Sequence, residues 1–158
     1  LYFDIGHKVK PSGIIEIGVR FGYSALSMIL GSASNPDFLG FDGEFYEKDS
    51  NKVAAASISS ATSGSCVIHN VNTSKVDVLQ VPDGFKADII HVDGDHEVDG
   101  LLRDLNLVTP FASKGTIIIV DDTTHFPLLG PATEQFAEDH DMKVDSYESL
   151  RGTMILYT

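Results

Sequence analysis

The chain has 158 residues, a net charge of −12 and 42% hydrophobic residues. This length suits one domain with a buried core and is too short for two, so we expect a single domain over residues 1–158. The acidic surface repels a phosphate backbone, and no apolar run approaches the roughly 18 residues of a membrane span, so neither nucleic acid nor a membrane is an expected partner.

Short apolar runs predict the strands, and helical stretches lie between them. The first five runs are rich in Ile and Val, as expected of strands covered on both faces. We assign no element to residues 1–3. The expected strands are Gly13–Val19, Phe38–Asp42, Cys66–His69, Ala87–Val92, Thr116–Val120, Lys143–Tyr147 and Thr153–Tyr157. The expected helices and turns are Ser24–Gly31, Lys48–Ala61, Lys75–Leu79, Glu97–Pro110 and Pro131–Asp139, and Gly31 is expected to be a left-handed C-cap.

This alternation of strands and helices favours a parallel, doubly wound sheet with right-handed crossovers. The last two strands differ, because their link, Glu148–Gly152, is too short for a crossover helix. They are expected to form an antiparallel hairpin at the sheet edge. Five parallel strands plus a C-terminal antiparallel hairpin resemble the seven-stranded, Rossmann-like α/β fold of methyltransferases. A nicotinamide-binding Rossmann domain would continue in parallel units.

Cys66 is the only cysteine, which excludes an internal disulfide and a multi-cysteine zinc site. It stands in an apolar run, so an inert buried thiol is expected. The sequence also shows no signal-peptide pattern at its start. A cytoplasmic location, where thiols stay reduced, fits these features.

The strongest signal follows the first strand, where an apolar run ends in a loop with two glycines and a helix begins. Gly18 allows a ligand to approach the backbone, and Gly22 allows a sharp turn with tight helix packing. Ser24 is expected to cap the helix, whose free amides can hold a carboxylate. The E-x-G-x-x-x-G spacing begins at Glu16 and suits a ligand without phosphate, unlike G-x-G-x-x-G. A generic glycine-rich turn is the alternative.

The segments Glu16-Ile17-Gly18 and Gly22-Tyr23-Ser24-Ala25 resemble motif I of class I S-adenosylmethionine-dependent methyltransferases, namely small-molecule O-methyltransferases of the catechol and caffeoyl-CoA type. The resemblance implies that the glycine turn faces the methionine part of S-adenosylmethionine and that Ser24 contacts its carboxylate. The expected cofactor contacts in this motif are therefore Glu16, Gly18, Gly22 and Ser24.

A carboxylate follows the second strand at Asp42, about 20 residues beyond the glycine loop, where an acidic side chain can accept hydrogen bonds from ribose hydroxyls. Asp42 is therefore the expected ribose ligand, with Glu44 as the fallback and Gly43 beside the adenine. The alternative is an ordinary turn aspartate, because Asp-Gly is a common turn pair. The segment 69–73, after the third strand, is a further candidate for adenine contacts.

Acidic residues also follow the fourth and fifth strands, which would be neighbours in this sheet. The segments are Asp93-Gly94-Asp95-His96 and Asp121-Asp122, and both would reach the same C-terminal edge. Clustered carboxylates need a cation, a shared proton or good hydrogen bonds. Three carboxylates with water suit Mg²⁺, Ca²⁺ or Mn²⁺, and such an ion would lower the pKa of a substrate hydroxyl.

This pattern is similar to metal-dependent sugar O-methyltransferases of the macrocin and aminocoumarin type. The resemblance implies metal ligands at Asp93, Asp121 and Asp122 and a base at Asp95. The catechol type has an Asp-Asn pair in place of Asp121-Asp122 and a lysine base in place of His96, so the base is open between Asp95 and His96. A histidine titrates near neutrality, which suits a base. The alternative is that Asp93 contacts only the cofactor or caps the next helix, and that the Asp121-Asp122 pair caps a helix or loop.

The expected function is transfer of a methyl group from S-adenosylmethionine to an oxygen of a small-molecule acceptor, by alignment and deprotonation. One rival is an NAD(P)-dependent Rossmann oxidoreductase, which the missing G-x-G-x-x-G and the terminal hairpin disfavour. A second rival is a non-catalytic S-adenosylmethionine-binding module, because no lid or inserted cap is visible to bury an acceptor. In a homodimer, the partner copy would complete the pocket instead.

Overall fold

The computed structural model of the protein describes residues 1–45 and 47–158. Its centre is a seven-stranded sheet in the order β3-β2-β1-β4-β5-β7-β6. The first five strands are parallel, and β7 pairs antiparallel with both β5 and β6, which confirms the predicted sheet and its terminal hairpin. The strands are β1 (Gly13–Ile17), β2 (Asp37–Asp42), β3 (Cys66–Asn70), β4 (Ile89–Val92), β5 (Ile117–Asp121), β6 (Lys143–Tyr147) and β7 (Thr153–Tyr157).

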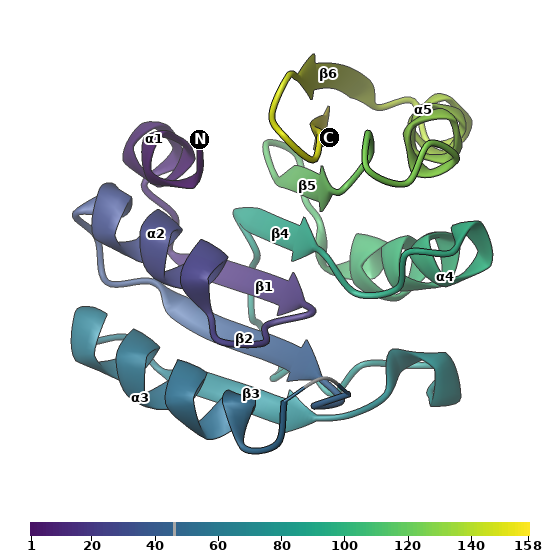
Figure 1. Ribbon diagram of the computed structural model, residues 1–158. Helices are drawn as coiled ribbons and strands as arrows, with labels where there is room; N and C mark the ends of the chain where they lie inside the picture. The colour runs from purple at the N-terminus through teal and green to yellow at the C-terminus, as the bar shows by residue number, and fades with distance from the viewer. Residues whose placement is uncertain (46) are drawn as a thin grey trace.

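Helices cover both faces of the sheet (Figure 1). Because successive strand residues point to opposite faces, Ile14 packs in the core that includes residues of α1, α2 and α3, and Ile15 packs in the core that includes residues of α4 and α5. The helices are α1 (Tyr2–Val9), α2 (Tyr23–Ser32), α3 (Ser50–Ala61), α4 (Val98–Val108) and α5 (Leu129–Asp139), with 3₁₀ turns η1 (Thr73–Lys75) and η2 (Thr109–Phe111). Within the described residues, no helix combines the length and apolar character that a membrane crossing requires.

Burial differs between the central strands and the edge strand β3. Every residue of β1 and β4 is buried, as the apolar runs predict. The same prediction is wrong for β3, because this strand lies at the sheet edge and leaves Val67 44% exposed. The free thiol of Cys66 is only partly buried there, and this burial raises its pKa.

The N-terminal helix α1 is the element that the sequence pattern does not reveal. It includes Tyr2 and Phe3, to which no element was assigned, and it packs against α2. Two glycines allow the close contact. A Cβ atom on Gly6 would lie 2.0 Å from the backbone oxygen of Met28, and one on Gly31 would lie 2.0 Å from that of Phe3.

The ends of α2 also differ from the prediction. Gly31 lies inside the helix rather than at its C-cap, because α2 continues to Ser32 and Ala33 takes the left-handed conformation with φ 52°. At the other end the N-cap is Gly22, not Ser24, which lies within the first turn. Gly31 is therefore a packing residue of the α1–α2 contact.

Candidate functional site

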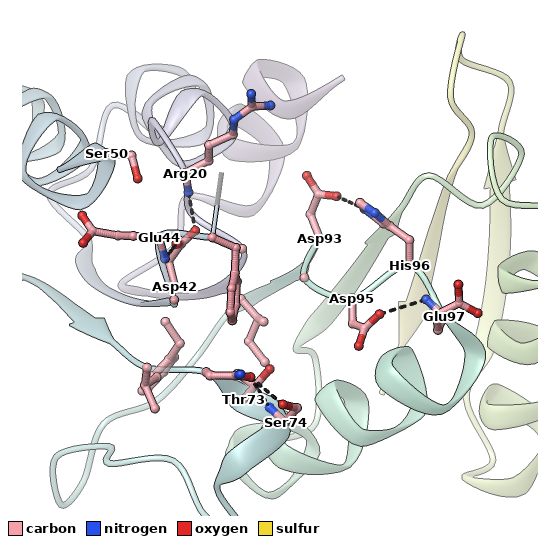
Figure 2. A pocket seen from close by; sticks show the side chains of 18 of the residues that line it. Arg20, Asp42, Glu44, Ser50, Thr73, Ser74, Asp93, Asp95, His96 and Glu97 are labelled. Carbon is pink, nitrogen blue, oxygen red and sulfur yellow. Dashed lines mark hydrogen bonds and ion pairs between the residues drawn. The ribbon is translucent and has the colours of Figure 1, made fainter. Parts of the chain in front are cut away.

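A cavity of about 620 Å³ lies at the C-terminal ends of β1, β2 and β4. The loops that follow these strands form much of its wall, as Figure 2 shows for Arg20, Glu44 and Asp95, and the segment after β3 adds Thr73 and Ser74. The lining residues include Gly18, Arg20, Asp42, Gly43, Glu44, Phe45, Asn72, Thr73, Asp93, Asp95, His96, Phe126 and Arg151. Loops from both halves of the sheet, with the segment after β3 and the link between β6 and β7, thus enclose one space, as expected for ligand sites in open α/β sheets.

The glycine turn begins the cavity wall at Gly18. This residue has φ +84°, and a Cβ atom there would lie 2.0 Å from the backbone oxygen of Asp93. The close approach joins the loop after β1 to the loop after β4. Only glycine fits both the left-handed backbone and the contact.

Gly18→Ala is therefore expected to lower the free energy of unfolding by about 3 kcal/mol, from a strained backbone and a steric overlap with Asp93. The matched control is Gly84→Ala, because Gly84 has φ +79° with no atom near its added Cβ. The control should lose only about 1 kcal/mol. Urea unfolding followed by far-UV circular dichroism suits the chain, which has no tryptophan. Equal losses in the two variants would contradict the overlap.

Glu16 and Ser24 lie beneath the glycine turn and not on the cavity wall. Glu16 is fully buried, and its Oε1 accepts a hydrogen bond from the Ser24 hydroxyl and lies 2.6 Å from Nδ1 of His91. Gly22 is also outside the cavity, where it packs against Ile58 of α3. These predicted cofactor residues support the turn from below in this structure.

Asp42 joins two loops at the end of β2. Its Oδ2 accepts the backbone N–H of Arg20 at 2.7 Å, and its Oδ1 accepts that of Glu44 at 2.6 Å (Figure 2). Each carboxylate oxygen can accept a second hydrogen bond, so a ligand can still use both. The predicted neighbour Gly43 also lines the cavity.

Only part of the segment 69–73, at the end of β3 and after it, lines the cavity. Asn72 and Thr73 line the cavity. Asn70 instead donates to Oε2 of Glu44 at 2.8 Å, and the ring of His69 stacks on Phe41 with centroids 5.2 Å apart.

The loops after β4 and β5 bring Asp93, His96 and Asp122 together. The Nε2 atom of His96 lies 3.4 Å from Oδ1 of Asp93 and 3.2 Å from Oδ2 of Asp122. The imidazole stacks on Phe126 with centroids 4.4 Å apart. The hydrogen bond with Asp93 raises the pKa of His96, although partial burial acts to lower it.

Asp95 lines the same cavity but is held at the start of α4. Its Oδ1 accepts the backbone N–H of Glu97 at 3.0 Å, and a Cβ on Gly100 would lie 2.1 Å from its carboxyl carbon. Of the two candidate bases, His96 is therefore the one in contact with the other acidic residues of the cluster.

Asp121 lies apart from this cluster. Its Oδ1 accepts from the Thr153 hydroxyl at 2.7 Å, and its Oδ2 accepts from the Tyr2 hydroxyl and lies 3.5 Å from Nε2 of His91. The cause is strand alternation: Asp121 is the last residue of β5 and follows Ile117 and Ile119 onto the face with α1 and α2.

A ligand atom from each of Asp93, His96 and Asp122 lies within 4.8 Å of the others, a spacing that can hold a metal ion. However, the guanidinium of Arg151 donates through Nε and Nη2 to both carboxylate oxygens of Asp122. A divalent ion there would face a fixed positive charge on one of its three ligands. With Arg151 in this position, the donor set does not fit a divalent ion.

Sequence reasoning missed three residues at this edge: Arg151, Phe126 and Tyr2. Arg151 lies in the short link between β6 and β7, and its only sequence signal is that the hairpin returns beside β5. Tyr2 belongs to the unassigned N-terminal helix. Burial is the largest cause that raises the pKa of Tyr2, and the charge of Asp121 adds to it, so the hydroxyl keeps its proton and donates.

A comparison with curated protein sequences finds no match. Among solved structures, the O-methyltransferase TomG from Streptomyces achromogenes, in complex with S-adenosylmethionine, is 16% identical with a TM-score of 0.75 and covers 99% of this chain and 78% of its own. An O-methyltransferase from Bacillus cereus, in complex with S-adenosylhomocysteine, is 14% identical with a TM-score of 0.74, over 99% of this chain and 79% of its own. These likenesses confirm the fold. The family model of a methyltransferase domain matches residues 15–123, and the chain therefore belongs to this methyltransferase family.

Proposed function

We propose that residues 1–158 form one domain that transfers a methyl group from S-adenosylmethionine to an oxygen of a small-molecule acceptor. The observation that carries the proposal is the single cavity that Gly18, Asp42 and Asp93 line together, at the ends of three neighbouring strands. Its volume of about 620 Å³ is in the range of small-molecule sites. TomG and the Bacillus cereus protein, both O-methyltransferases, hold this cofactor or its product in the same fold.

Each part of the cofactor has a counterpart in the cavity. We assign the ribose hydroxyls to Asp42, whose two oxygens are fixed by backbone N–H groups. We assign the methionine part to the turn at Gly18 and the adenine to the wall formed by Gly43, Asn72 and Thr73. Glu16 and Ser24 would keep the turn in place from beneath.

When bound, S-adenosylmethionine supplies a methyl group on a positively charged sulfur, which regains the bonding electron pair as the acceptor oxygen binds the methyl. The protein must orient the acceptor and remove its proton. His96 is the proposed base: its Nε2–H donates to Asp93, so the neutral ring would take the hydroxyl proton at Nδ1, and Asp93 and Asp122 would stabilise the imidazolium that forms. Asp95 is a positioning residue, because it fixes the start of α4.

Calorimetric titration with S-adenosylhomocysteine tests the cofactor site. We expect saturable binding to the wild-type protein, and Asp42→Asn should weaken it by about 10- to 100-fold, because charge-assisted hydrogen bonds to the ribose become neutral ones. The matched control is Asp83→Asn, since Asp83 is exposed and does not line the cavity. The control should bind as the wild type does.

The same titration separates the rival functions. Binding of NAD(P) without binding of S-adenosylhomocysteine would replace the proposal with a dinucleotide-dependent oxidoreductase. Binding of S-adenosylhomocysteine without methyl transfer to any compound in a library of hydroxylated acceptors would instead favour a non-catalytic binding module.

A further inference from the structure

The cluster of Asp93, His96 and Asp122 has the layout of a cation site. The two carboxylates come from loops after neighbouring strands, and the Nε2 atom of His96 lies within 3.4 Å of both. Asp122 is almost fully buried, with only 3% of its side chain exposed. A buried carboxylate is costly unless a positive group pairs with it.

Arg151 supplies that positive group. Nε and Nη2 of its guanidinium each donate to a different oxygen of Asp122, which is the bidentate geometry that arginine forms best with a carboxylate. The backbone of Arg151 is also fixed, because its carbonyl accepts the N–H groups of Thr124 and His125, each at 2.9 Å. The backbone position that carries the guanidinium is therefore fixed by the hairpin.

We propose that Arg151 is the resident cation of this cluster, in the place of a divalent metal ion, and that it donates a hydrogen bond to the acceptor oxygen. The second part rests on the proposed function. Arg151 lines the cavity together with Asp93 and His96. Its bonds to Asp122 use two of the five N–H donors that a guanidinium carries, so donors remain for a ligand.

The chemistry of the two cations differs in a way that matters for the acceptor. A divalent ion binds an acceptor oxygen directly and can hold two oxygens of one molecule. A guanidinium offers directional N–H donors, and with Nε and Nη2 donating to Asp122 its remaining donors can stabilise negative charge on an acceptor oxygen. The class of acceptor that fits is therefore a hydroxyl compound whose oxygen becomes anionic, without the need for a second chelating oxygen.

Titration with Mn²⁺ tests directly whether Arg151 replaces a divalent ion. Binding is measured as the loss of the free-ion signal in electron paramagnetic resonance. Wild-type protein should show no saturable Mn²⁺ binding in the millimolar range. Arg151→Met should bind Mn²⁺ saturably, with an affinity at least about tenfold higher than that of the wild type. Adding Asp122→Asn to this variant should remove the gain. Arg103→Met is the matched control, because Arg103 is exposed on α4 and does not line the cavity.

Each outcome decides whether Arg151 takes the place of a divalent metal ion. Saturable Mn²⁺ binding to the wild type would overturn this proposal, because the guanidinium would then not exclude the ion. Absence of binding in both wild type and Arg151→Met would also overturn it, because the cluster would not be a cation site. Titration of the same proteins with S-adenosylhomocysteine, and far-UV circular dichroism for folding, keep a failure of the proposed function separate from this result.

Discussion

Replacement of His96 by Gln is expected to slow methyl transfer by about 100- to 10,000-fold, the usual contribution of a general base. Gln keeps a polar side chain of similar reach but cannot take a proton. The rate would be measured with S-adenosylmethionine labelled in its methyl group and the most reactive compound from the acceptor library. Binding of S-adenosylhomocysteine should be unchanged, since the variant removes a base and not a cofactor contact.

The pH dependence gives a second readout for His96. Its pKa is raised in the structure, chiefly by the hydrogen bond with Asp93. A base acts in its deprotonated form, so kcat/KM of the wild type should rise with pH through an apparent pKa above the ordinary histidine value, and His96→Gln should lose this rise. His125→Gln is the matched control, because His125 also contacts Phe126 but does not line the cavity. A variant of His96 that keeps both rate and pH profile would contradict the assignment.

His91→Leu is expected to lower the free energy of unfolding by about 3–5 kcal/mol near neutral pH, because it leaves a buried carboxylate without its cation. His91 is fully buried between β1 and β5, with Nδ1 2.6 Å from Glu16 and Nε2 3.5 Å from Asp121. The double variant Glu16→Leu with His91→Leu removes the unpaired charge and should recover much of the loss. Urea unfolding would measure all three proteins.

The stability loss in His91→Leu should also depend on pH. Burial acts to lower the pKa of His91, but hydrogen bonds with Asp121 and Glu16 prevail and raise it from 6.5 to about 10. A raised pKa stabilises the folded state fully below 6.5, and this contribution disappears as the pH rises to about 10. The wild type and the variant should therefore converge in stability over this pH range. Parallel curves would show that His91 is not charged in the folded protein.

The sheet could be predicted from sequence because its signals are local. Ile and Val fill β1, β4 and β5, and the link 148–152 is too short for a helix, so strand type and the terminal hairpin follow from short segments. The edge position of β3 does not follow, because it depends on which strands pair. The helix α1 was missed because it begins at Tyr2, among the residues to which no element was assigned, and it spans only eight residues, of which Ile5 and Gly6 are buried.

The sequence predicts that the site lies at the C-terminal edge of the sheet, but it does not predict which side chains contact one another there. The loops after β1, β2 and β4 do meet in one cavity, because parallel strands end at the same edge. Whether Asp121 or Asp122 lies beside Asp93 depends on where β5 ends. The residues before Asp121 are all apolar, so the sequence does not show which face of the sheet each side chain points to. Arg151 reaches Asp122 across 29 positions of sequence, so only the folded hairpin shows the pair.

The glycine contact between α1 and α2 links the outer surface of the protein to this edge. With Gly6 and Gly31 at the crossing, the two helices lie as close as their backbones allow, and Tyr2 then reaches Asp121 from the first turn of α1. A larger residue at either glycine would move α1 outward and withdraw the Tyr2 hydroxyl. The two sides of α1 should therefore differ in the substitutions that they tolerate. Side chains on the outward side, where Phe3 is 55% exposed, can change in size. Residues on the inward side must stay small, because Tyr2 would otherwise lose its hydrogen bond to Asp121 at the end of β5.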